Sequence, residues 1–203
     1  MNGNGFVFAV PGGGKSFTGA KMEAGSVFLN TEDDIIFVDP TLEYFDVAEA
    51  YGGAVINLAT YTDKYLNPLE VDLDNLDIDD TNGQVRDKCS FMLGICEQAM
   101  DGEILPEYKS IIDRSVRKMY KRIAALPREK RSQPIMSDFL EVLKEQEETE
   151  ARKIKLVLEI FVEGSLNIFN HQTNIDIENR VLVYGLSLGE ACGAVLLETQ
   201  GNA

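Results

Sequence analysis

The sequence contains no tryptophan, a single histidine and three cysteines. Zinc sites and cysteine–histidine catalytic pairs need such residues in clusters, and the sequence shows neither C-x-x-C spacing nor a second histidine. His171 stands in a polar stretch, which indicates a structural or surface residue rather than a catalytic one. We predict buried, reduced thiols at Cys89, Cys96 and Cys192.

Long apolar runs and positive charge are also scarce. No run approaches the ~18 apolar residues that a membrane helix needs, and the first residues have neither the basic region nor the apolar core of a signal peptide. We therefore expect a cytoplasmic protein. With 19 lysines and arginines against 34 aspartates and glutamates, the formal net charge is −15. This balance argues against generic nucleic-acid binding by the chain as a whole.

What the sequence does contain is a phosphate-binding motif of the form [A/G]-x-x-x-x-G-K-[S/T], at positions 9–16. Glycines let the backbone wrap around a phosphate, so that N–H groups point at it. Lys15 is predicted to reach the β- and γ-phosphates of ATP, and Ser16 to bind Mg²⁺. The alternative is a glycine-rich surface turn. The predicted nucleotide-binding residues are Pro11, Gly12, Gly13, Gly14, Lys15, Ser16 and Phe17.

Short apolar strands alternate with helical patterns, which predicts an α/β fold with a mostly parallel sheet. Asp39 directly follows one such strand, so its carboxylate is expected at the edge of the sheet where open α/β folds bind ligands. The phosphate-binding motif belongs to the same edge, which makes Asp39 a candidate metal ligand beside Ser16. The predicted strands are 6–8, 35–38, 54–58 and 181–184, and the predicted helices near them are 15–29 and 42–51.

The middle of the chain has no strand signals. An acidic stretch that begins at 67–69 and runs to Asp80 lacks the glycine and terminal glutamate of a calcium loop, so we predict a solvated linker. Helical patterns follow over 85–100, 106–125, 136–147 and 150–163 and predict an all-helical insert.

The second helix of this insert has a basic side, which could meet DNA or an acidic partner. A solvated helix face is the commoner explanation of such a pattern. The residues concerned are Arg114, Arg117, Lys118, Lys121 and Arg122.

These patterns divide the chain into three parts. Residues 1–80 are predicted to form the N-terminal part of a P-loop ATPase core, and residues 81–165 the helical insert. Residues 166–203 are predicted to supply a strand that returns to the core, followed by a weakly patterned tail.

Several motifs resemble one known family in the expected order. PGGGKSF, TEDDIIFVDPTLEY, the GG-x-VINL strand, YLNPLEVDL and GSLNIFNHQTNIDIENR are similar to the motor ATPases of type IV secretion and conjugative transfer, the VirB/TraC type. The versions carried by conjugative transposons of Gram-positive bacteria are the most similar. The resemblance runs from about residue 4 to residue 184.

The resemblance implies a RecA-like core, interrupted by an all-helical subdomain, that hydrolyses ATP. Such proteins energise channel assembly or substrate transfer, usually as homo-hexamers that contact type IV secretion channel proteins at the membrane periphery. Asp39, Pro40, Glu43 and Tyr44 fall on the family's DP-x-x-EY motif, which commonly reads DPEGEY, whereas Thr41 and Leu42 stand here in the middle. The resemblance implies that Glu43 positions or polarises a water or a magnesium ligand. The alternative is an acid that only stabilises a helix N-terminus.

Other parts of the family pattern are not found after position 184: the Walker B strand with its acidic pair, a glutamine-bearing motif and an arginine finger. We therefore expect a fragment or truncated product with an incomplete sheet, which binds nucleotide with weak or no turnover on its own. Two alternatives stay open. One is a nucleotide-binding interaction module that does not hydrolyse ATP, and the other is a different P-loop enzyme, such as a small kinase with an arginine-rich lid.

Overall fold

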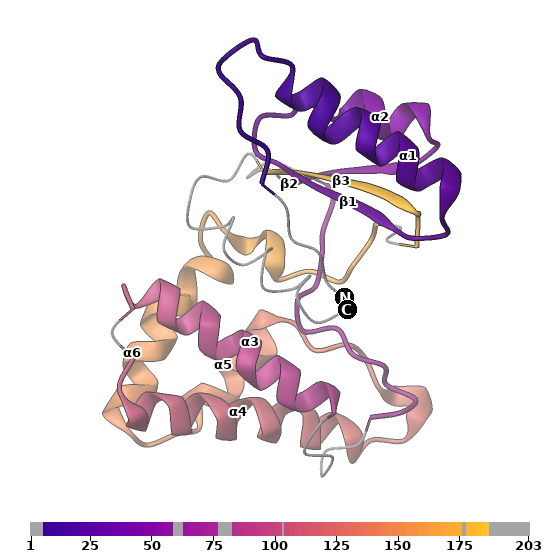
Figure 1. Cartoon of the computed structure of the whole chain (residues 1–203). Helices are drawn as coiled ribbons and strands as arrows, with labels where there is room; N and C mark the ends of the chain where they lie inside the picture. Colours follow the sequence, from indigo (N-terminus) through magenta and orange to yellow (C-terminus); the bar gives the residue numbers. More distant parts are fainter. Residues whose placement is uncertain (1–5, 59–62, 77–82, 103, 176–177, 187–203) are drawn as a thin grey trace. The chain divides into compact units, whose positions relative to one another are not determined.

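The computed structural model describes residues 6–58, 63–76, 83–102, 104–175 and 178–186 (Figure 1). The chain forms two compact units. One comprises Met1–Ala59 and Ile175–Ser187, and the other includes Thr60–Asn174. The predicted segments around Asp77, Asp79 and Asp80, and the tail from 187 onward with Cys192, lie outside the described residues. None of the described helices is long and apolar enough to cross a membrane.

The first unit is built on a three-stranded parallel sheet. Its strands are β1 (Ile35–Asp39), β2 (Ala54–Leu58) and β3 (Val181–Leu186), in the order β1-β3-β2. Ile35 lies opposite Val181, and Ala54 opposite Leu182. The central strand β3 comes from a distant part of the sequence and is buried throughout its described side chains. Three of the predicted strands and their parallel arrangement are therefore confirmed.

Helices cover one face of this sheet. The phosphate-binding motif leads into a π-helix, η1 (Lys15–Lys21), which continues as α1 (Met22–Asn30), so the predicted helix over 15–29 is confirmed. Together with α2 (Phe45–Ala50), α1 lies on the same side of the sheet (Figure 1). The small core under α1 contains Ala24, Ile35 and Val181, with Val27, Phe28, Phe37 and Tyr51 packed against it.

Arg180, immediately before β3, closes this core at its edge. Its guanidinium donates hydrogen bonds to the carbonyl oxygens of Thr31 (2.8 Å) and Asp33 (3.1 Å) and lies over the Phe28 ring, 4.9 Å from its centroid. The backbone carbonyl of Arg180 also accepts a hydrogen bond from the Ile35 N–H (2.7 Å). One residue thus connects the start of β3 to the turn between α1 and β1.

Two expectations for the first unit are wrong. Residues 6–8 form no strand, and Phe6 and Phe8 are 84% and 88% exposed, because no strand among the described residues pairs with them. The helix predicted over 42–51 begins only at Phe45. Leu42 has a positive φ of 59°, which is incompatible with a right-handed helix, so the chain turns before α2 begins.

The second unit is helical, as predicted for the insert. Its helices are α3 (Gln84–Ala99), α4 (Pro106–Ala124), α5 (Met136–Lys144) and α6 (Thr149–Leu158), with short 3₁₀ turns η2 (Arg128–Lys130), η3 (Glu159–Phe161) and η4 (Asn167–Phe169). Its core side chains include Met92, Ile95, Ile112, Tyr120, Phe139, Leu143, Ile154 and Phe169.

The segment that precedes α3 packs into this unit and is not a solvated linker over 67–71. Leu69 is fully buried, and its carbonyl oxygen accepts a hydrogen bond from the Tyr120 hydroxyl (2.6 Å). The Asn67 amide donates to the carbonyl oxygen of Pro134 (2.9 Å). The Gln133 side chain bonds both the N–H (3.0 Å) and the carbonyl (2.6 Å) of Val71. Glu70 within this segment and the following Asp72 and Asp74 are exposed, as predicted.

Candidate functional site

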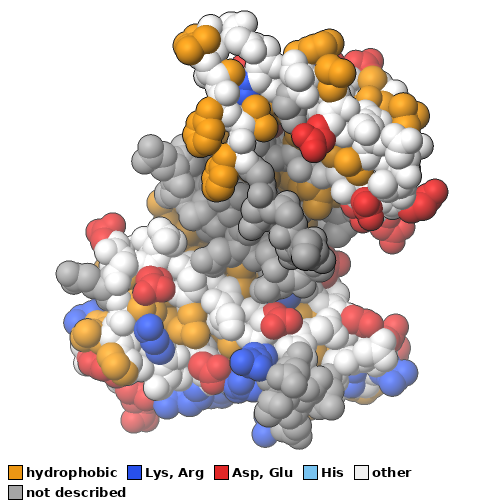
Figure 2. All heavy atoms as spheres, in the orientation of Figure 1, with side chains coloured by type: hydrophobic (Ala, Val, Ile, Leu, Met, Phe, Trp, Pro, Cys, Tyr) orange, Lys and Arg blue, Asp and Glu red, His pale blue; other side chains and the backbone are white. Residues whose placement is uncertain are grey.

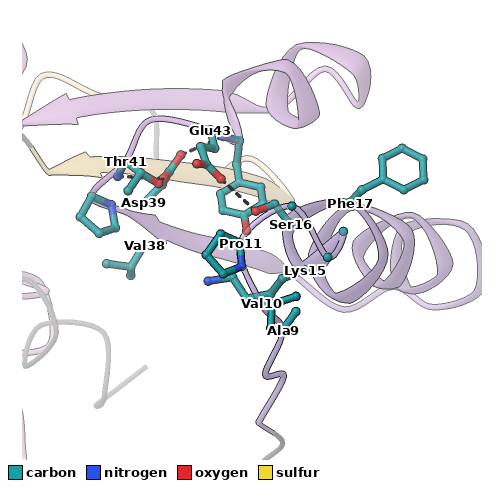
Figure 3. Close-up of a pocket in the computed structure, with 15 residues that line it drawn as sticks. Ala9, Val10, Pro11, Lys15, Ser16, Phe17, Val38, Asp39, Thr41 and Glu43 are labelled. Carbon is teal, nitrogen blue, oxygen red and sulfur yellow. Dashed lines mark hydrogen bonds between the residues drawn. The ribbon is translucent and has the colours of Figure 1, made fainter.

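A pocket of about 730 Å³ lies in the first unit, beyond the carboxyl end of β1 (Figure 3). It is lined by the whole phosphate-binding motif and by the turn that follows β1. Every residue predicted to bind nucleotide or metal, and the predicted catalytic Glu43, lies on its wall. The lining consists of residues 9–17, 38–41, 43 and 44.

The conformation of the loop depends on its glycines. Gly12 and Gly14 have positive φ angles of 79° and 75°, a region that side-chain-bearing residues rarely adopt. A Cβ at Gly13 would lie 2.9 Å from the Val10 carbonyl oxygen. The same oxygen accepts a hydrogen bond from the Gly13 N–H. The loop therefore folds into a turn whose inner side carries backbone rather than side chains, as a site for phosphate oxygens requires.

Lys15 and Ser16 follow this loop as the first residues of η1. The Ser16 hydroxyl donates a hydrogen bond to Oε2 of Glu43 at 2.9 Å (Figure 3). Adjacent oxygen ligands of an octahedral Mg²⁺ at ~2.1 Å are about 3.0 Å apart, so this pair of oxygens has the spacing that two such ligands need. Phe17 also borders the pocket, but its ring is 65% exposed and points away from the acidic side chains (Figure 3).

Asp39 is fully buried, and both of its carboxylate oxygens accept hydrogen bonds. Oδ1 accepts the backbone N–H (3.1 Å) and the hydroxyl (3.0 Å) of Thr41, and Oδ2 accepts the N–H of Tyr44 (2.8 Å). The carboxylate therefore holds the turn that carries Glu43. The sequence predicts Asp39 as a metal ligand beside Ser16, whereas the hydrogen bonds of its carboxylate go to this turn.

The turn itself contains the two departures from the DPEGEY pattern. Thr41 contributes a hydroxyl to Asp39, and Leu42 adopts the positive φ for which glycine is suited. Tyr44 stacks on Phe37 of β1 with ring centroids 4.8 Å apart, which anchors the end of the turn. Glu43 is left exposed between these anchors and faces Ser16. Thr41 and Leu42 in the middle of the motif therefore leave Glu43 in contact with Ser16.

A second contact between η1 and this region was missed in the sequence. Lys21 Nζ lies 2.5 Å from Oδ2 of Asp46, and the hydrogen bond from Lys21 lowers the pKa of the Asp46 carboxyl below its usual value. The one sequence feature that bears on this contact is the order of the residues. Lys21 follows Ser16 and Asp46 follows Glu43, so the second pair could meet beside the first. Sequence patterns do not identify such contacts between separate elements.

The comparisons with known proteins identify the fold of the chain. No protein-family model matches the chain, and no curated protein sequence matches it significantly. Among solved structures, VirB4 of Thermoanaerobacter pseudethanolicus superposes with a TM-score of 0.74 over 96% of this chain, at 19% sequence identity. The fold is that of VirB4. The chain spans 55% of the length of that VirB4 chain, so about half of it has a counterpart here.

The VirB4 likeness confirms the predicted fold class, an α/β RecA-like core with a partial parallel sheet and a helical insert. It also supports, at the level of fold, the resemblance to type IV secretion motor ATPases. Among the described residues, no cluster of three or more histidine, cysteine or acidic side chains could hold a metal. A Mg²⁺ in this pocket would therefore need nucleotide phosphates in addition to Ser16 and a carboxylate.

The remaining predicted residues lie in the helical unit. Burial raises the pKa of the Cys89 and Cys96 thiols to about 12, which confirms buried, reduced cysteines at these two positions. His171 stacks on Tyr65, with ring centroids 4.0 Å apart.

The basic side of α4 is largely paired with acids. Arg114 lies 2.6 Å from Glu148 and Arg117 3.0 Å from Asp113, and Lys118 and Arg122 share Glu145. Hydrogen bonds from these last two cations lower the pKa of Glu145 to about 2. Figure 2 shows blue and red side chains interspersed over this unit. The solvated helix face is therefore the better interpretation of this pattern.

Proposed function

We propose that this chain binds ATP with Mg²⁺ in the pocket beyond β1 and is the nucleotide-binding part of a type IV secretion or conjugative transfer ATPase. The observation that carries the proposal is the juxtaposition of two separate motifs. The glycine loop and the DPTLEY turn line one pocket, and Ser16 and Glu43 meet there at 2.9 Å. The likeness to the VirB4 fold supports the same assignment.

Each residue of the pocket has a role that its position suits. Backbone N–H groups of the loop bind the phosphates, and Lys15 reaches the β- and γ-phosphates. Ser16 supplies an oxygen to Mg²⁺, and Glu43, which is exposed beside it, accepts a hydrogen bond from a metal-bound or attacking water. Asp39 acts indirectly, because its buried carboxylate fixes the turn that presents Glu43. The bound Mg²⁺ would neutralise charge on the phosphates during transfer.

For the whole protein, we propose ATP hydrolysis that energises substrate transfer or channel assembly. Its partners would be type IV secretion channel proteins at the cytoplasmic face of the membrane, and its assembly a homo-hexamer. Hydrolysis by this chain alone is expected to be slow. Of the two carboxylates on the pocket wall, Asp39 is already committed to the turn, and one exposed acid is a weak means of orienting an attacking water.

The other functions considered receive less support. A kinase lid or a DNA-binding stripe on α4 would need free basic side chains, whereas four of the five cations on the basic side of α4 pair with acids of the same unit. A nucleotide-binding module without hydrolysis uses the same pocket and differs only in turnover. It is therefore an outcome of the experiment below.

The test is the melting temperature of the purified chain with and without Mg·ATP, with phosphate release followed in the same samples. At nucleotide concentrations about a hundredfold above Kd, we expect a rise of about 5–10 °C. Lys15→Ala should abolish the rise, while the exposed Lys130→Ala, on η2 in the other unit, should retain it. A stable protein without any shift would contradict nucleotide binding. A shift without phosphate release would support the module that does not hydrolyse ATP.

A further inference from the structure

Two side-chain contacts connect η1 to the turn and helix that follow β1. Near the start of η1, the Ser16 hydroxyl donates to Glu43 at 2.9 Å. At its end, Lys21 donates to Asp46 at 2.5 Å. All four residues belong to the first unit, and Lys21, with 27% of its side chain exposed, is the more enclosed member of its pair.

The spacing of these contacts matches the unusual form of η1. Ser16 and Lys21 are five residues apart, and in a π-helix hydrogen bonds run from residue i to i+5, so such residues lie nearly above one another. The Met22 N–H accordingly bonds the Phe17 carbonyl oxygen. In an α-helix, residues five apart point about 140° away from each other. The π-helical form of η1 therefore brings both side chains to the side of the helix that carries the two contacts.

The acidic partners of Ser16 and Lys21 come from the turn after β1 and from α2. Glu43 is the last exposed residue of the turn held by Asp39, and Asp46 is in the first turn of α2. Since the turn and α2 are anchored by Asp39 and by the Tyr44–Phe37 stack, they form a fixed support for both contacts. The Lys21 contact therefore determines which way the helix, and with it Ser16, is rotated relative to Glu43.

We propose that Lys21 and Asp46 form a positioning pair, which keeps η1 in its π-helical form and thereby holds the Ser16 hydroxyl in place for the Mg²⁺ of a bound nucleotide. This inference rests on the nucleotide binding proposed above. Without the pair, η1 can relax to an α-helix, which turns Ser16 away from Glu43. The phosphate loop precedes η1 and is shaped by its own glycines, so its backbone N–H groups can bind phosphate without the pair, whereas Lys15 lies beside Ser16 in η1 and shares its movement.

The test separates binding that depends on the metal from binding that does not. Titration calorimetry would give the Kd of ADP for the full chain in Mg²⁺ and in EDTA. In Lys21→Ala and in the isosteric Asp46→Asn, we expect a Kd for Mg·ADP about two- to fivefold higher, the range that an exposed ion pair supports. The Kd in EDTA should rise less than the Kd in Mg²⁺, because the backbone N–H groups of the loop still bind the phosphates. The exchanged pair, Lys21→Asp with Asp46→Lys, should recover most of the affinity.

Two controls test the mechanism. Glu49→Ala removes another exposed carboxylate of α2 and should bind Mg·ADP as the unaltered protein does. In a Ser16→Ala background, Lys21→Ala should have no further effect, because the pair acts through Ser16. Melting temperatures without nucleotide show whether each variant is folded. Because the Asp46 side chain is exposed, Asp46→Asn should disturb folding least.

The outcomes distinguish this inference from the proposed function. If the unaltered chain binds Mg·ADP in a manner that depends on Lys15, but the pair variants bind equally well or more tightly, the positioning role is wrong and the proposed function stands. Equal weakening in Mg²⁺ and in EDTA would also overturn it, since the pair would then support the fold in general. If the unaltered chain binds no ADP at all, both proposals fail.

Discussion

At the scale of single residues, the two acids of the DPTLEY turn have different tasks. Asp39 is fully buried and accepts three hydrogen bonds, whereas Glu43 is exposed and makes one contact, with Ser16. A buried acceptor that is removed leaves its donors without partners, which costs more free energy than the hydrogen bonds themselves contribute. Substitutions of Asp39 are therefore expected to affect mainly stability, and substitutions of Glu43 mainly ligand binding.

Asp39→Ala is expected to lower the free energy of unfolding by about 3 kcal/mol, because the N–H groups of Thr41 and Tyr44 lose their acceptor in a buried site. Asp39→Asn should cost less, since its remaining carbonyl oxygen can still accept from Thr41. Urea unfolding of each variant measures the difference. The exposed Asp34→Ala serves as the control and should lie within about 0.5 kcal/mol of the unaltered chain. An unchanged Asp39→Ala would contradict a structural role for this carboxylate.

Leu42 presents a conflict between backbone and side chain. Its φ of 59° disfavours any residue with a Cβ, while its side chain packs over Gly185 of β3. Both Leu42→Ala and Leu42→Gly remove that packing, so the comparison between them isolates the backbone term. We expect the glycine variant to be more stable than the alanine variant by about 1 kcal/mol in urea unfolding, the reverse of the order at ordinary positions. The usual order would show that the turn can relax.

At the scale of elements, the connection between α2 and β2 depends on two adjacent glycines. Gly52 has a positive φ of 66° with open space around it. Gly53 instead lies against β3, where an added Cβ would be 2.7 Å from the Cβ of Val181 and closer still to its carbonyl oxygen. A side chain at position 52 is disfavoured by the backbone conformation, and a side chain at position 53 by contact with the neighbouring strand β3.

The two corresponding alanine variants should therefore differ in size of effect. Gly52→Ala is expected to cost about 1 kcal/mol, the strain of a left-handed residue. Gly53→Ala is expected to cost about 3 kcal/mol, because β2 must move away from β3 to make room. Thermal and urea unfolding give both values, and Gly52→Ala is the matched control. Equal effects would mean that the contact between these strands is looser than the structure indicates.

At the scale of the whole molecule, the two units differ in the kinds of side chain that they expose. The helical unit pairs its basic and acidic side chains. Exposed apolar side chains instead gather around the phosphate loop of the first unit (Figure 2), among them Phe6, Phe8, Val10 and Phe17. In the described sheet, β1 and β2 are both edge strands. Exposed apolar residues and open strand edges both favour association between molecules.

We therefore expect the chain to self-associate as its concentration rises, and Phe6→Ser with Phe8→Ser to reduce this tendency. Light scattering coupled to size-exclusion chromatography measures it directly. Leu105→Ser removes an exposed apolar side chain of the other unit and should leave association unchanged. If the double variant associates as strongly as the unaltered chain, the surface around the phosphate loop is not responsible.

Local chemistry determined much of this architecture. The runs 35–38, 54–58 and 181–184 are mostly apolar and rich in β-branched residues, and Lys15 and Ser16 follow three glycines, so each local pattern indicates its strand or loop. The helices of the insert could likewise be predicted from their periodicity. The strand expected at 6–8 shows the limit of this reasoning, because an apolar run becomes a strand only when another strand pairs with it.

The sequence by itself thus determined the α/β class, the helical insert and the phosphate loop, since these follow from neighbouring residues. Only the tertiary structure decided that Asp39 holds a turn while Glu43 meets Ser16, that Asn67 is buried among helices, and that Lys21 pairs with Asp46. Each of these contacts joins elements whose distance in space no local pattern records. Burial and hydrogen-bond partners, which set the task of a polar side chain, arise only when those elements pack.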